Sequence, residues 1–175
     1  IPVDHMVAVP MFAQHIRDYL GTEVERVAVA PDTGRAKLAG KFAEMIGGGL
    51  VVVNKERPGH NQAKVTGVIG DVDGKVAVMT DDIIDTAGTL SKTVDALRAQ
   101  GAHRILAAGV HGVLSGPALQ RIEQSPLEQV LITNTTPVEE KLQKSSKLRS
   151  LSVAPLLGEA IRRIHENSSV SSLFV

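Results

Sequence analysis

The stretch 75-KVAVMTDDIIDTAGT-89 joins an apolar run to a short segment of Asp, Thr and Gly residues. Lys75–Thr80 has the composition of a buried strand, and the segment from Leu90 to Gln100 has helical spacing that stops at Gly101. The stretch therefore predicts a strand, a tight turn and a helix in direct succession, with polar side chains gathered at the turn.

The same alternation of strand and helix continues on both sides of this stretch. Further strands are predicted at 24–30, 50–54, 65–70, 104–110 and 129–133, and helices at 36–46, 117–124 and 155–165. The polar residues 55–64, which include Pro and Gly, are predicted to form an exposed loop. Such an alternation predicts an α/β fold, a single domain over residues 1–175 with a parallel sheet and helices on both faces.

Composition excludes several classes of protein. The 175 residues contain no Cys and carry a formal net charge of zero, which excludes disulfide scaffolds and thiolate metal sites and argues against a nucleic-acid partner. Aromatic residues make up 2% of the chain, too few for platforms on which bases stack. Apolar runs are too short to span a membrane. We expect a soluble, cytoplasmic domain.

The segment from Asp81 to Thr89 is the strongest candidate for a binding site. Ligands of parallel sheets bind beyond the carboxyl ends of the strands, and adjacent carboxylates at a strand end are costly unless they meet a cation or hydroxyl groups. Gly88 permits a tight turn whose N–H groups converge on an anion, and Thr86 and Thr89 add hydroxyl groups. Together they predict a phosphorylated pentose as ligand. The alternative is an acidic strand end followed by an ordinary Thr N-cap.

Two further strand ends carry weaker candidates. Asp32, in the turn Pro31-Asp32-Thr33-Gly34, offers carboxylate oxygens to Mg²⁺, although the same sequence is a common turn. Lys55 and Arg57 begin the polar stretch and are suited to stabilising a phosphoryl group in transfer. Two cations of this kind also occur on ordinary solvated surfaces.

Several blocks of sequence together resemble one family. They are HGVLSGPA at 111–118, ITNT at 132–135, LSVAPLL at 151–157, AIRRIH at 160–165 and SVS at 169–171. These blocks, with the Asp/Thr/Gly segment, are similar to the C-terminal domain of the ribose-phosphate pyrophosphokinases. That domain has the type I phosphoribosyltransferase-like fold. The opening residues Ile1-Pro2-Val3-Asp4-His5 resemble a segment that lies mid-chain in the family, so we expect an N-terminal domain to be missing here.

The resemblance implies an activity. Enzymes of this family transfer the pyrophosphoryl group of ATP to the 1-hydroxyl of ribose 5-phosphate with Mg²⁺, which yields phosphoribosyl pyrophosphate and AMP for nucleotide biosynthesis. The family assembles as homo-oligomers, typically hexamers.

The resemblance also implies roles for individual residues. Ribose 5-phosphate is expected on Asp81, Asp82, Asp85, Thr86, Ala87, Gly88 and Thr89. Lys55 and Arg57 are expected to be catalytic, with Arg57 also contacting substrate, and Asp32 to help bind Mg²⁺. Ser169 and Ser171 match residues of a regulatory phosphate or ADP site between subunits.

The chain departs from the family in two places. Arg35 follows Gly34 where the family usually has a second glycine, and Ser172 stands where an aromatic residue often follows the Ser-Val-Ser motif. In the family most ATP contacts and a Mg²⁺-binding His come from the N-terminal domain. We therefore expect this chain to bind ribose 5-phosphate and to turn over poorly by itself.

Two other functions share part of these features. A phosphoribosyltransferase has the same sugar-phosphate loop but is not expected to carry Lys55 and Arg57 together with the blocks at 115–118 and 133–135. A regulatory subunit that associates with the synthetase is expected to have an altered catalytic loop. Release of AMP from ATP and ribose 5-phosphate distinguishes the synthetase from both.

Overall fold

A seven-stranded sheet forms the centre of the molecule in the computed structural model, which describes residues 3–59 and 62–173, and only the backbone at 55–59 and 62–66. The strand order is β3-β2-β1-β4-β5-β6-β7, and every neighbouring pair is parallel except β2 and β3. The predicted α/β fold with a parallel sheet is therefore confirmed.

The strands and helices follow the predicted alternation closely. The strands are β1 (Arg26–Ala30), β2 (Gly49–Gly59), β3 (Gln62–Ile69), β4 (Val76–Ile84), β5 (Arg104–Gly112), β6 (Gln129–Thr133) and β7 (Leu148–Leu151). The helices are α1 (Val9–Leu20), α2 (Ala36–Ile46), α3 (Gly88–Ala99), α4 (Ala118–Gln124), α5 (Glu139–Gln143) and α6 (Ala154–His165), with short 3₁₀ turns η1 (Thr33–Arg35) and η2 (Ser171–Leu173).

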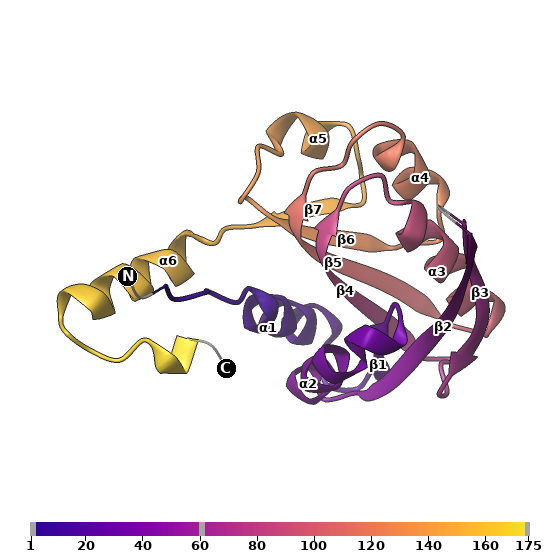
Figure 1. Ribbon diagram of the computed structural model, residues 1–175, viewed down its shortest axis with the longest axis horizontal. Helices are drawn as coiled ribbons and strands as arrows, with labels where there is room; N and C mark the ends of the chain where they lie inside the picture. The colour runs from indigo at the N-terminus through magenta and orange to yellow at the C-terminus, as the bar shows by residue number, and fades with distance from the viewer. Residues whose placement is uncertain (1–2, 60–61, 174–175) are drawn as a thin grey trace.

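Two apolar cores lie on opposite faces of the sheet, because successive strand residues point to opposite sides. On β4, Val76 and Val78 pack with Phe12 of α1 and Phe42 of α2. Residues of β4 that face the other way, such as Met79, pack with α3 and α4. Figure 1 shows α1 and α2 on one side of the sheet and α3 and α4 on the other.

The described residues of the polar stretch 55–64, which are 55–59 and 62–64, lie in strands, and the prediction of a loop there is wrong. Its backbone continues β2 to Gly59 and begins β3 at Gln62, and the two strands pair antiparallel at the edge of the sheet. Strand pairing satisfies the backbone N–H and C=O groups whatever the side chains are, and an edge hairpin does not need apolar side chains on both faces. Polar composition therefore hid the hairpin.

Strand β4 is also longer than predicted, and it includes Asp81 and Asp82. It continues because β5 runs beside it to Gly112, and the register pairs Asp81 with Gly109 and Ile84 with Gly112. The two carboxylates therefore belong to residues near the C-terminal end of a paired strand, and the strand's backbone fixes their positions.

The chain order of the sheet reverses between β1 and β4. The chain leaves β1 through α2 to β2 on one side, and it leaves β4 through α3 to β5 on the other side. Connections that diverge in this way leave a crevice beyond the carboxyl ends of the two strands, where α/β proteins bind their ligands. Asp32 follows β1 and Asp81 lies at the end of β4, so both acids stand at this crevice.

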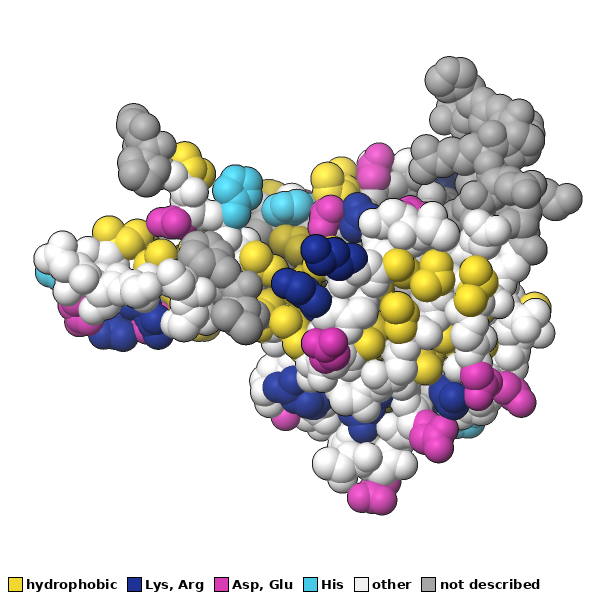
Figure 2. Space-filling view, turned by 60° about the horizontal axis from the view of Figure 1, so that its bottom comes forward, with side chains coloured by type: hydrophobic (Ala, Val, Ile, Leu, Met, Phe, Trp, Pro, Cys, Tyr) yellow, Lys and Arg dark blue, Asp and Glu magenta, His cyan; other side chains and the backbone are white. Residues whose placement is uncertain are grey.

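The C-terminal part of the chain stands away from the sheet (Figure 1). Helix α6 buries only Ala160, whereas Leu157, Ile161 and Ile164 are 46%, 68% and 61% exposed. Figure 2 shows hydrophobic side chains on this projecting part. Within the described residues, no helix is long and apolar enough to cross a membrane.

Candidate active site

A cavity of about 320 Å³ lies at the crevice between β1 and β4. Asp32 and Arg35 line it from the β1–α2 connection, and Asp81 lines it from β4. The complete segment from Asp85 to Thr89 lines the rest of its polar wall. Tertiary structure therefore brings together residues from two strand ends that are about 50 positions apart in the sequence.

The segment Asp85–Thr89, which we call the anion loop, opens α3. Ala87 has φ 56° and ψ 14°, the left-handed conformation, and no described side chain caps the helix. The first helical hydrogen bond runs from Ser91 N to the Ala87 carbonyl, which leaves the N–H groups of Gly88, Thr89 and Leu90 available for an anion. The helix dipole adds positive potential at the same point.

Residues from the β5–α4 region hold the anion loop in place. The Ser115 hydroxyl donates to a carboxylate oxygen of Asp85, and Ser115 N donates to the Asp85 carbonyl over 3.1 Å. Arg121 of α4 donates from Nη1 to the Thr86 carbonyl over 2.8 Å. A Cβ atom on Gly88 would lie 3.3 Å from that same Nη1. Glycine at this position therefore lets Arg121 reach the loop.

Arg35 connects the acidic residues at the mouth of the cavity. Its Nη1 lies 2.9 Å from Asp81 Oδ1, and its Nη2 lies 3.0 Å from Asp82 Oδ2. Its backbone N donates to Asp32 Oδ1 over 3.1 Å. Asp82 does not line the cavity, and its side chain is 66% exposed. The sequence identifies Arg35 only as a departure from the family's usual turn and does not predict these contacts with Asp81 and Asp82.

The catalytic candidates Lys55 and Arg57 lie on the backbone of β2, and their side chains are outside the described part of the chain. Lys55 pairs with Val65 across the hairpin. In the sheet order β2 is the neighbour of β1, the strand that leads to Asp32. Their predicted role in phosphoryl transfer stays a prediction.

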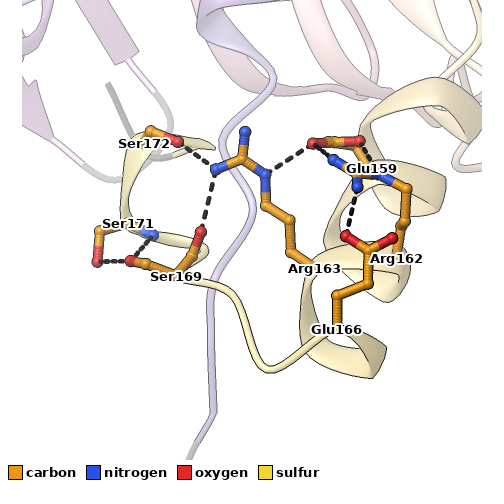
Figure 3. A network of polar contacts seen from close by, with 7 residues as sticks. All are labelled: Glu159, Arg162, Arg163, Glu166, Ser169, Ser171 and Ser172. Carbon is orange, nitrogen blue, oxygen red and sulfur yellow. Dashed lines mark hydrogen bonds and ion pairs between the residues drawn. The ribbon is translucent and has the colours of Figure 1, made fainter.

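Ser169 and Ser171, predicted to be regulatory, do not line the cavity and lie beyond α6 (Figure 3). The Ser169 hydroxyl donates to Ser171 Oγ over 3.1 Å, and Arg163 Nη1 donates to the Ser169 carbonyl over 3.0 Å. Arg162 and Arg163 also hydrogen-bond Glu159 and lower the pKa of its carboxyl to about 2. The network fixes the C-terminal segment against α6.

Ser115 and Arg121 are site residues that sequence reasoning missed in this role. The sequence block that contains Ser115 supports the family resemblance and does not by itself indicate a contact with Asp85. In the structure the Ser115 hydroxyl hydrogen-bonds the carboxylate of Asp85, which lies 30 positions earlier in the sequence. No local pattern predicts such a contact, since it depends on β4 and β5 being neighbours.

Sheet order, crevice and anion loop together define the class of protein. A parallel sheet that reverses its order beside a strand–loop–helix segment with unpaired N–H groups, and with acids on both sides, is a type I phosphoribosyltransferase-like domain. Comparison with known proteins then narrows the class. A family model described as "Phosphoribosyl synthetase-associated domain" matches residues 58–175, and the chain belongs to that family.

Curated relatives agree with this assignment. The chain is 48% identical over 174 residues to the ribose-phosphate pyrophosphokinase of Aquifex aeolicus and 49% identical over 175 residues to that of Caldanaerobacter subterraneus. The alignments cover 99% of this chain and 55% and 54% of the two relatives. The chain thus spans about half the length of the curated relatives it matches, and the predicted resemblance is confirmed.

A solved structure supports the fold. The crystal structure of phosphoribosylpyrophosphate synthetase from Mycobacterium smegmatis superimposes with a TM-score of 0.84 at 39% sequence identity. The match covers 95% of this chain and 53% of that one. The expected type I phosphoribosyltransferase-like fold is confirmed.

Proposed function

We propose that this chain is the ribose 5-phosphate-binding domain of a ribose-phosphate pyrophosphokinase. The observation that carries the proposal is the single cavity wall formed by Asp81 and the anion loop. Acidic side chains that can accept hydrogen bonds from sugar hydroxyls stand beside N–H groups that can donate to a phosphate. A phosphorylated pentose has both kinds of group, at opposite ends of one small molecule.

In this proposal the anion loop binds the 5-phosphate. The N–H groups of Gly88, Thr89 and Leu90 and the hydroxyls of Thr86 and Thr89 donate to its oxygens. The carboxylates of Asp81 and Asp85 accept from the ring hydroxyls, and Ser115 keeps Asp85 in place for this purpose. Binding at both ends orients the 1-hydroxyl of the sugar, and orientation accounts for much of the catalysis of phosphoryl transfer.

The proposed reaction joins the ribose 1-oxygen to the β-phosphorus of ATP. The bond between that phosphorus and the α,β-bridging oxygen breaks, AMP leaves, and the 1-hydroxyl loses its proton. Lys55 and Arg57 are proposed to stabilise the charge on the transferring group. The complete reaction belongs to proteins about twice as long as this chain.

Magnesium fits the donors at the mouth of the cavity. No three His, Cys, Asp or Glu side chains form a ready metal site in the described part of the chain. Mg²⁺ is usually bound by one or two carboxylates together with substrate phosphates and water, and Asp32 supplies such a carboxylate. When bound, the ion would neutralise charge on the phosphates.

Calorimetry with ribose 5-phosphate tests the proposal directly. The chain is expected to bind ribose 5-phosphate, and Asp85→Asn is expected to weaken binding about tenfold, because the amide accepts fewer hydrogen bonds than the carboxylate. Asp95→Asn on α3 makes the same substitution on an exposed residue outside the cavity and is expected to leave binding unchanged. No detectable binding, or equal binding by both variants, would contradict the proposal.

Assembly into homo-oligomers in the cytoplasm is the remaining part of the proposal. The exposed apolar residues Leu157, Ile161 and Ile164 recur on one side of α6 and support a contact surface there. Light scattering of the chain with Ile161→Glu, compared with the unmodified chain, measures the effect on assembly. The regulatory role of Ser169 and Ser171 is proposed on the resemblance alone.

A further inference from the structure

Three nitrogen atoms of Arg35 contact three different carboxylates. Its two terminal guanidinium nitrogens contact Asp81 and Asp82, and its backbone N–H contacts Asp32. The first two acids lie on β4, and the third lies at the end of β1. The guanidinium of Arg35 therefore offsets negative charge on β4, and its backbone N–H hydrogen-bonds the acid that follows β1.

The carboxylates that Arg35 contacts are also the oxygen ligands that a divalent cation would need. A cation bound to Asp81 would take up oxygen lone pairs that now accept from Nη1. Asp81 Oδ1 also accepts from Asp82 N over 2.8 Å, so this oxygen already has two donors. A cation and the Arg35 guanidinium carry the same sign of charge, so each disfavours the other at these carboxylates.

We propose that Arg35 is an internal counter-ion that competes with a divalent cation and with sugar hydroxyls for Asp81 and Asp82. In the structure its guanidinium contacts both carboxylates. A ligand that brings its own cation displaces the guanidinium, which swings out from η1. Arg35 thereby selects for ligands loaded with a divalent cation over the bare sugar phosphate. The last statement rests on the proposed function, whereas the competition for the carboxylates does not.

The exposure of these groups allows the exchange. The side chains of Arg35, Asp81 and Asp82 are 33%, 38% and 66% exposed. Ion pairs that are this accessible to water are weak enough to be broken by a ligand. The geometry of the guanidinium matters as well as its charge, because two terminal nitrogens on a planar fork can reach two carboxylates and a lysine ammonium is a single point charge.

Binding of Mn²⁺, followed by electron paramagnetic resonance, tests the proposal without any enzymatic activity. Arg35→Gln is expected to bind Mn²⁺ about fivefold more tightly than the unmodified chain. Lys41→Gln removes the same charge from α2 outside this cavity and is expected to change the affinity less than twofold. Adding Asp81→Asn to the Arg35→Gln variant is expected to abolish the gain.

Arg35→Lys separates competition for the carboxylates from simple charge repulsion. It keeps the charge and loses the fork, so we expect a gain of about twofold in Mn²⁺ affinity. An Arg35→Lys affinity equal to that of the unmodified chain would overturn the proposal, as would an Arg35→Gln variant that binds Mn²⁺ no more tightly or not at all. The melting temperature of each variant with and without MgCl₂ gives a second readout, with the largest rise expected for Arg35→Gln.

Calorimetry with ribose 5-phosphate keeps the two proposals distinguishable. If Arg35→Gln gains Mn²⁺ affinity while no variant binds the sugar phosphate, the counter-ion inference holds and the proposed function fails. If Arg35→Gln and Arg35→Lys bind ribose 5-phosphate and Mn²⁺ with the affinities of the unmodified chain, the proposed function holds and the inference fails. With both intact, Mg²⁺ is expected to increase ribose 5-phosphate affinity more in the unmodified chain than in Arg35→Gln.

Discussion

Replacing Arg121 with alanine is expected to loosen the anion loop while every residue that we place on the ligand is left unchanged. Arg121 reaches across from α4 and donates to the Thr86 carbonyl over 2.8 Å. Alanine leaves this carbonyl to water and opens space beside Gly88, where the guanidinium now lies. The loop then has more conformations available, and only some of them direct its N–H groups at a common point.

The size of the effect follows from the exposure of the contact. A hydrogen bond to a charged group contributes ~1.5–3 kcal/mol in a protected site, and Arg121 is exposed to water. We therefore expect Arg121→Ala to reduce the binding free energy of an anion in the loop by about 1 kcal/mol, which corresponds to a roughly fivefold larger Kd. Arg121→Lys keeps the positive charge and a donor, so its loss is expected to be smaller.

Titration with inorganic phosphate, followed by calorimetry, measures this loss. Arg98→Ala is the matched control, because Arg98 donates to the Ala102 and His103 carbonyls beyond the other end of α3. Both variants are expected to lower the free energy of unfolding, and only Arg121→Ala is expected to weaken phosphate binding. If Arg121→Ala binds phosphate as tightly as the unmodified chain, the loop does not depend on this anchor and the reasoning is wrong.

Two further predictions concern stability. A Cβ on Gly48 would lie 2.5 Å from the Arg26 carbonyl oxygen, so Gly48→Ala is expected to lower the free energy of unfolding by about 1–3 kcal/mol. A Cβ on Gly40, inside α2, has its nearest contact at 3.9 Å, so Gly40→Ala is expected to raise the free energy of unfolding by ~0.5–1 kcal/mol. Urea unfolding that ranks the two variants the other way would refute the packing argument. Glu128 accepts from Arg104 and Tyr19 over 2.6 Å, and the Arg104 guanidinium lowers the pKa of Glu128 below its usual 4.5. A lowered folded-state pKa means that the stabilisation is present above pH 4.5 and is lost as the pH falls below it. Glu128→Gln is therefore expected to cost about 1 kcal/mol at pH 7 and less at pH 3, and a difference from the unmodified chain that does not change between these pH values would contradict this.

The sequence by itself determined the α/β fold and the anion loop, because both are local. Apolar runs and helical spacing repeat over a few residues, and the segment from Asp81 to Thr89 is continuous in the chain. The short elements β7 and α5 and the helix α1 were not predicted. The strands predicted at 50–54 and 65–70 are present, but the loop predicted at 55–64 is wrong, because backbone pairing extends β2 and β3 into polar residues that give no strand signal.

Only the tertiary structure decided how the site is held and neutralised. Arg35 meets Asp82 across 47 positions, Arg121 meets Thr86 across 35, and Ser115 meets Asp85 across 30. These contacts depend on which strands are neighbours in the sheet and on where the chain reverses between β1 and β4. Side-chain patterns record what each segment buries, whereas the charges that meet at a strand end are set by the packing of segments far apart in the chain.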